Sequence, residues 1–143
     1  MTDMPDDLTL WQETLAVEHA VIWGFGVVGS VADLDGAAEA SLRQHRDRRA
    51  TCTEVIVDMG GDPVASAPAY DVPRPASKDA GRLLAADLDA SASIAYARLA
   101  GATLRDTRLL AARWLRESAI AQTAWAGVVP ALPGLEQAIR TPQ

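Results

Sequence analysis

The amino-acid sequence predicts an all-α fold, a four-helix bundle made of two antiparallel helix hairpins that a long proline-rich crossover joins. Alanine, a strong helix former, accounts for 28 of the 143 residues, whereas aromatic residues make up 5%. This composition disfavours an all-β fold. Apolar residues recur at spacings of three and four in four segments, and residues 60–77 contain four prolines. Such elements are typical of a bundle with one long connection, and we expect one domain over residues 1–143.

The first two helices are predicted over approximately residues 8–32 and 36–59. In the first segment, spacings of three and four define one helix face. This face consists of Leu8, Trp11, Leu15, Glu18, Ile22, Phe25, Gly29 and Ala32. The second segment repeats the spacing at Leu42, His45, Arg49, Cys52, Ile56 and Met59. Asp33 and Asp35, in the turn between the segments, are candidate N-caps.

The third and fourth helices are predicted over approximately residues 78–100 and 104–126. Ser77 is a suitable N-cap for the third helix, and Gly101 is a typical residue to follow its end. Thr103 has the spacing of a capping box at the start of the fourth helix. The sequence therefore predicts a second helix hairpin with a short turn.

The segment over residues 60–77 is too long for a tight turn and too rich in proline for a helix. When extended, it can run the roughly 36 Å length of a helix of about 24 residues. The second and third helices are therefore expected to be parallel. A short tail is expected at residues 135–143.

Charge and cysteine content exclude several classes of function. The formal net charge is −6, with 19 acidic and 13 basic residues, opposite to the balance of a free-standing nucleic-acid binder. Cys52 is the only cysteine, so an intramolecular disulfide and a multi-cysteine metal site are excluded, and its expected role is packing. The acidic N-terminus and the lack of an apolar run of about 20 residues favour a cytoplasmic protein without a membrane partner.

Residues Gly24 to Gly29 match the G-x-G-x-x-G pattern of dinucleotide-binding proteins. That pattern acts between a strand and a helix, with an acidic residue about 20 positions later. Here the preceding residues have helical spacing, and Asp58 lies 29 positions after Gly29. The alternative is that the glycines let a neighbouring helix approach closely, at a helix-propensity cost of about 1 kcal/mol each.

Charged residues occupy positions that the helical spacing turns inward. Glu18 lies in the first apolar face, and His45 and Arg49 lie in the second. Counting from the second short turn places Asp87 and Glu117 opposite one another. Because burial of an unpaired charge is unfavourable, each group needs a partner, a proton or a metal. We expect Glu18, His45, Arg49, Asp87 and Glu117 to form a buried polar cluster at mid-bundle.

Short motifs along the chain resemble those of a known family. They are Glu18-His19, His45-Arg46-Asp47-Arg48-Arg49, Tyr70 with Val72-Pro73, and Arg113-Trp114. With these motifs the chain resembles the uncharacterised ferritin-like domains found in actinobacteria. The resemblance implies a ferritin-like four-helix bundle and no established activity.

The wider ferritin-like superfamily carries a di-iron site, with a Glu on each of two helices and Glu-x-x-His on the other two. This sequence has Leu42 where one Glu belongs, Ile120 where one His belongs, and the positive charge of Arg49 nearby. The pattern favours a metal-free ion-pair core in a non-catalytic structural or interaction module without a cofactor. In the alternative, a metal-binding or redox protein, iron or manganese is held by Glu18, His45, Asp87 and Glu117. We expect a homodimer, and the sequence identifies no other protein partner.

Overall fold

The computed structural model describes residues 4–126 of the chain. These residues form four α-helices and no strand: α1 (Asp7–Val28), α2 (Asp35–Asp58), α3 (Lys78–Leu99) and α4 (Arg105–Ala126). The all-α four-helix bundle predicted from the sequence is confirmed. The domain expected over residues 1–143 extends past the described residues at both ends, and the tail expected at 135–143 lies outside them.

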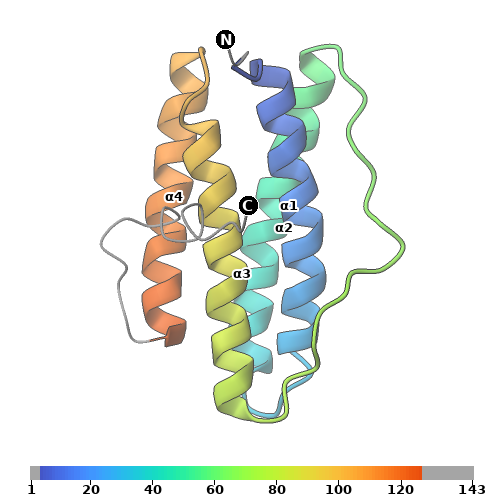
Figure 1. Ribbon diagram of the computed structural model, residues 1–143, viewed down its shortest axis with the longest axis vertical. Coiled ribbons are helices and arrows are strands. Elements are labelled where there is room, and N and C mark those ends of the chain that lie inside the picture. The colour runs from blue at the N-terminus through green and yellow to red at the C-terminus, as the bar shows by residue number, and fades with distance from the viewer. Residues whose placement is uncertain (1–3, 127–143) are drawn as a thin grey trace, which may run out of the picture.

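The four helices lie side by side as two antiparallel hairpins (Figure 1). α1 pairs with α2, α3 pairs with α4, and α1 also packs against α3. Residues 61–77 contain no helix. They run along the outside of the bundle, from the end of α2 to the start of α3. α2 and α3 are consequently parallel, as expected for a crossover of this length.

A row of side chains on α1 holds the crossover in place. Gln12 donates to a carbonyl of the crossover at 2.6 Å and accepts from the Val64 N–H at 2.8 Å. His19 Nε2 donates to the Val64 carbonyl at 2.9 Å. The Trp23 ring lies against Tyr70, with centroids 6.0 Å apart. Gln12, His19 and Trp23 share a helix face because spacings of seven and four bring residues to the same side.

The turn between α1 and α2 differs in detail from the prediction. α1 ends at Val28, four residues early, and the Ser30 N–H already bonds to a carbonyl three residues back. Asp33 then adopts a φ of 66°, in the left-handed region that no helix continues through. The N-cap residue of α2 is Leu34, without a side-chain cap, so the capping role expected for Asp33 or Asp35 was wrong.

The two remaining helix starts are capped in different ways. Ser77 caps α3 as predicted, and its Oγ accepts from the Ala80 N–H at 3.1 Å. At the start of α4 the acceptor is the buried Asp7 of α1, which accepts from the N–H groups of Thr103 at 2.7 Å and Leu104 at 3.1 Å. Asp7 and Thr103 are 96 residues apart. This contact therefore joins the two hairpins. A local capping box at Thr103 would lie within one hairpin and would not join them.

Replacement of Asp7 with alanine is expected to destabilise the bundle by about 1–2 kcal/mol, because two backbone N–H groups lose their acceptor. Burial by itself raises the pKa of Asp7, but the hydrogen bonds from Thr103 and Leu104 and the charge of Arg108 outweigh it and lower the pKa below 3.8. A lowered folded-state pKa stabilises the fold above the unfolded value, and this stabilisation is lost as the pH falls through the folded value.

Urea unfolding at neutral and at acid pH measures the contribution of Asp7. The matched control is Asp6→Ala, which removes only the cap that Asp6 provides to Thr9 within α1. Equal urea midpoints for the wild type and Asp7→Ala at neutral pH would contradict the capping of α4 by Asp7.

Aromatic side chains link the helices inside the bundle. Trp11 of α1 and Trp114 of α4 meet edge to face at 6.0 Å, and Tyr96 of α3 lies 5.4 Å from Trp114. Cys52 is fully buried, and burial with the nearby charge of Glu18 raises the pKa of its thiol. These aromatic side chains and Cys52 thus face inward. No helix within residues 4–126 combines the length and the hydropathy needed to cross a bilayer.

The glycine motif lies in α1 and at its end, and not between a strand and a helix as dinucleotide binding requires. A Cβ at Gly24 would clash with the Leu88 side chain of α3, whereas a Cβ at Gly26 would meet nothing within 4 Å. Close helix packing therefore explains Gly24 and leaves Gly26 without a packing reason.

Candidate functional site

His45 of α2 is fully buried, with 0% of its surface exposed, and lies between two carboxylates. Its Nδ1 is 2.7 Å from Glu18 Oε2 in α1, and its Nε2 is 3.2 Å from Asp89 Oδ1 in α3. The Phe25 ring stacks on the imidazole with centroids 5.4 Å apart. An ionised carboxylate only accepts hydrogen bonds, so a ring that donates from both nitrogens to two such groups is a cation.

The charge of His45 results from two opposing effects. Burial favours the neutral ring and by itself lowers the pKa of His45. The hydrogen bonds and negative charges of Asp89 and Glu18 outweigh burial, and they raise the pKa above its ordinary value of 6.5. The two carboxylates therefore favour the imidazolium form of His45.

The stability of the bundle is expected to fall as the pH rises above 6.5, the ordinary pKa of His45. A raised folded-state pKa stabilises the fold fully below the unfolded value, and this contribution is lost as the pH rises through the folded value. Thermal unfolding from about pH 6 to about pH 9 measures the effect, which is expected to be absent in a His45→Gln variant. A wild-type midpoint that rises over this interval would contradict the buried imidazolium.

Arg48, also in α2, extends the network to α4. Its Nη2 donates to Glu117 Oε2 at 2.7 Å, and its Nη1 donates to the hydroxyls of Tyr96 at 3.1 Å and Ser118 at 3.3 Å. The guanidinium carbon lies 5.1 Å from the ring centroid of Tyr96 and 5.7 Å from that of Trp114, within the range of cation–π attraction. The buried guanidinium is thus bonded and enclosed on several sides.

Tyr96 of α3 connects the two parts of the network. Its hydroxyl donates to Glu18 Oε1 and accepts from Arg48. Burial and the charge of Glu18 raise the pKa of Tyr96 well above 10.0, so the phenol keeps the hydrogen that it donates. One continuous chain of hydrogen bonds therefore runs through all four helices, and we call it the ion-pair network. Its members are Asp89, His45, Glu18, Tyr96, Arg48, Glu117 and Ser118.

The buried charges of the ion-pair network balance one another. Two cations, His45 and Arg48, and two anions, Glu18 and Asp89, are almost inaccessible to solvent. The carboxylate of Glu117 is 36% exposed, so water also solvates it. Removal of charges from water is costly unless each has a hydrogen-bonded partner of opposite sign. Each of the four buried charges has such a partner, and within residues 4–126 Oδ2 of Asp89 is the one carboxylate oxygen of Glu18 and Asp89 that is left without a hydrogen bond.

The structure places three residues of the expected polar cluster in the network. Glu18 and His45 are in direct contact, and Glu117 lies at the solvent edge. Arg49 is half-buried, and Arg48 supplies the buried guanidinium, so the expectation for Arg49 was wrong. Residues three and four positions after His45 lie about 60° and 40° to either side of it on the helix. Spacing alone therefore does not indicate whether Arg48 or Arg49 points into the bundle.

Asp87 was expected to face inward, but it is exposed, and Asp89 is buried instead. Leu83, which lies one turn before Asp87 on the same side of α3, is likewise exposed at 61%. The inward face of α3 follows a four-residue spacing of mostly small residues: Gly81, Ala85, Asp89 and Ser93. This spacing is the signal in the sequence that indicates the correct face.

The residues of the ion-pair network do not fit a di-metal centre. A metal-bound histidine offers a nitrogen lone pair, but both nitrogens of His45 face carboxylates, and Arg48 neutralises Glu117. Within residues 4–126 no three His, Cys, Asp or Glu side chains gather as a metal-binding group. The set Glu18, His45, Asp87 and Glu117 does not come together, because Asp87 faces solvent.

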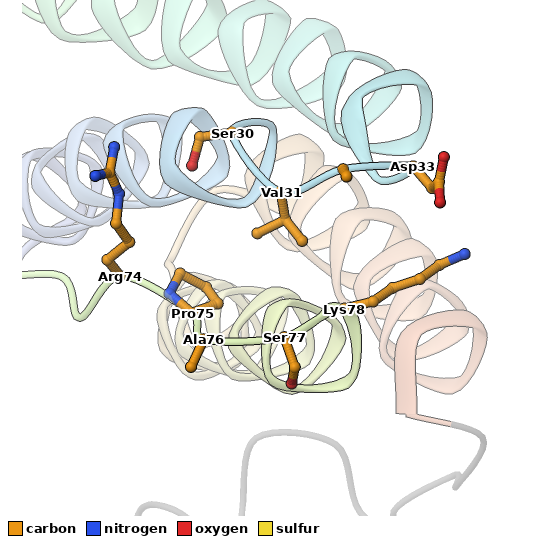
Figure 2. A pocket seen from close by; sticks show the side chains of 9 residues that line it. Ser30, Val31, Asp33, Arg74, Pro75, Ala76, Ser77 and Lys78 are labelled. Carbon is orange, nitrogen blue, oxygen red and sulfur yellow. The ribbon is translucent and has the colours of Figure 1, made fainter.

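Three hollows on the surface of residues 4–126 are lined by no member of the network. One of them, of about 410 Å³, opens between the α1–α2 turn and the start of α3. Figure 2 shows Arg74 and Lys78 at its two sides, with Val31 and Pro75 between them. None of the three hollows gives a substrate access to His45.

The bundle can be assigned to a protein family. Residues 11–137 match the family described as a domain of unknown function, DUF4439, and the chain belongs to this family. Its structure is similar to the crystal structure of a conserved hypothetical protein, rv2844, from Mycobacterium tuberculosis. The two share 28% sequence identity with a TM-score of 0.78, over 83% of this chain and 93% of that one. No curated protein matches the chain.

Proposed function

We propose that this protein is a non-catalytic structural or interaction module, with a ferritin-like scaffold and an ion-pair network where such bundles hold two metal ions. The observation that carries the proposal is the pairing of both ring nitrogens of His45 with carboxylates. A doubly protonated imidazole has no lone pair for a metal, and it does not accept a proton as a general base.

The ferritin-like scaffold is supported by the topology and by the position of the network. Two antiparallel hairpins and one long crossover form the bundle, an arrangement that ferritin-like folds also have. The ligands of a di-metal site come from all four helices of such a bundle. The network likewise draws on each helix, with Glu18 from α1, His45 from α2, Asp89 from α3 and Glu117 from α4.

A structural role is supported by the geometry of the network. Each buried polar group of the network bonds to at least one partner on a different helix, so a shift of one helix along another breaks several bonds at once. Buried polar groups of this kind are known to select one register in helical assemblies. We propose that the ion-pair network sets the register of the four helices.

The metal content of protein purified without a chelator tests the proposal. We expect well under one transition-metal ion per chain, and no gain in thermal stability on addition of ferrous or manganous ions, since a bound ion would stabilise the fold. The comparison variant is Glu18→Ala. Stoichiometric iron or manganese in the wild type, lost in Glu18→Ala, would contradict the proposal and support the alternative of a metal-binding or redox protein.

Self-association as a homodimer and a cytoplasmic location both stay predictions from the sequence. Sedimentation equilibrium measures the first directly, and a mass of two chains is expected. A mass of one chain at every concentration would contradict the homodimer.

A further inference from the structure

A groove of about 590 Å³ lies where α1, α2 and the crossover meet. Small-molecule sites commonly have volumes of about 300–1,000 Å³. Five residues give the groove its chemistry: Trp23 and Gly26 of α1, Arg46 of α2, and Tyr70 and Arg74 of the crossover. None of them belongs to the ion-pair network, so the groove is a separate feature of the molecule.

Two aromatic rings form one wall of the groove. Trp23 is 42% exposed although it is a large apolar residue, and its ring centroid lies 6.0 Å from that of Tyr70 at an interplanar angle of 57°. The Tyr70 hydroxyl accepts from the Ala67 N–H at 3.0 Å, which fixes its position on the crossover. The exposed Trp23 ring, with the half-buried Tyr70 tilted beside it, offers an apolar face on which another ring can stack.

The groove is positively charged in an acidic protein. The chain has a net charge of −6, yet the lining contains two arginines and no acidic residue. Arg46 approaches Glu39 at 3.8 Å with both side chains about half exposed, a weak surface pair that leaves the guanidinium available. Arg74 also lines the neighbouring hollow drawn in Figure 2, where it extends from the crossover. Guanidinium groups favour carboxylate and phosphate partners.

Gly26 keeps the groove open. A glycine in a helix costs about 1 kcal/mol relative to alanine, and no neighbouring helix requires one here, because a Cβ at this position would meet nothing within 4 Å. Gly26 also lines the groove. A Cβ at this position would therefore be accommodated without displacing any part of the protein, and we expect a larger side chain to fill the groove.

We propose that the groove binds a small anion with a flat aromatic body, either a carboxylate or a phosphate ester. The aromatic body lies against Trp23 and Tyr70, and the anionic group meets Arg46 and Arg74. Gly26 leaves the space that the ligand occupies. Stacking and charge act together in this site, so a neutral aromatic molecule of the same size binds less tightly.

Titration of the full chain with 1-naphthyl phosphate and with 1-naphthoate tests the proposal. The neutral analogue is 1-naphthalenemethanol. The indole N–H resonance of Trp23 is expected to shift and to saturate with either anion, while those of the buried Trp11 and Trp114 move little. Both anions are expected to bind at least about tenfold more tightly than the neutral analogue. The tighter of the two anions identifies a carboxylate or a phosphate ester as the preferred class.

Three variants separate the groove from the rest of the surface. Gly26→Leu is expected to unfold at the wild-type midpoint or above it, yet to lose binding. Arg74→Gln is expected to weaken anion binding about tenfold and to leave the neutral analogue unaffected. Arg43 is an exposed arginine of α2 that lies outside the groove. The Arg43→Gln substitution is expected to change neither the binding of the anions nor that of the neutral analogue. An unshifted Trp23 resonance, equal binding of the neutral analogue, or full binding in Gly26→Leu would overturn the proposal.

Discussion

Replacement of His45 with leucine is expected to lower the free energy of unfolding by about 3–5 kcal/mol, the usual cost of removing one partner from a buried ion pair. Glu18 and Asp89 are almost inaccessible to solvent, and without the imidazolium both would be buried anions with no cation in direct contact. The whole stability of a domain is about 5–15 kcal/mol. Urea unfolding followed by circular dichroism is therefore expected to show a large drop in midpoint.

Two further variants distinguish lost charge from lost packing at His45. Addition of Glu18→Gln and Asp89→Asn to the His45→Leu chain removes the uncompensated charges and is expected to recover part of the stability. His19→Leu removes the other histidine, whose Nε2 bonds to the Val64 carbonyl, and is expected to cost about 1 kcal/mol. A His45→Leu loss as small as the His19→Leu loss would contradict the ion-pair network.

Replacement of Arg48 with methionine is expected to cost about 2–4 kcal/mol, the second largest effect. The variant keeps an apolar side chain of similar length but loses the bonds to Glu117 and Tyr96 and the cation–π contact with Trp114. The cost is smaller than at His45 because the Glu117 carboxylate is partly exposed and water can solvate it. Urea unfolding under the same conditions as for His45→Leu measures this loss of stability.

The neighbouring arginine provides a matched control for Arg48. Arg49 is half-buried, and Arg49→Met is expected to change stability by no more than about 0.5 kcal/mol, as substitutions away from buried networks usually do. The two variants alter the same residue type at adjacent positions of one helix. A larger loss for Arg49→Met than for Arg48→Met would show that α2 presents the other face to the core.

Much of the helical architecture could be predicted from the sequence, because helix periodicity and caps are local properties. The Ser77 cap and the four helical segments are of this kind. The end of α1 was predicted four residues late, since apolar residues continue the spacing into a turn where Asp33 adopts a left-handed conformation. The cap of α4 by Asp7 joins residues 96 positions apart, and no local pattern contains that information.

The candidate site was predictable only in part. Glu18 and His45 interrupt apolar helix faces, so the spacing predicts that these two polar side chains point inward. Arg48 could not be separated from Arg49, because both positions lie near the inward side of α2 and the partners on α4 decide between them. Tyr96 was missed because an aromatic residue in a bundle suggests packing, and its hydrogen bond to Glu18 depends on the relative placement of α1 and α3.

The protonation state of His45 tests the ion-pair network most directly. Nitrogen-15 NMR spectra of the imidazole at neutral pH are expected to show a hydrogen on both Nδ1 and Nε2, with slow exchange because the ring is buried. Addition of ferrous or manganous ions is expected to leave these resonances unchanged. A neutral ring with one bare nitrogen, whose resonance shifts or broadens when metal is added, would contradict the ion-pair network and indicate a metal site at His45.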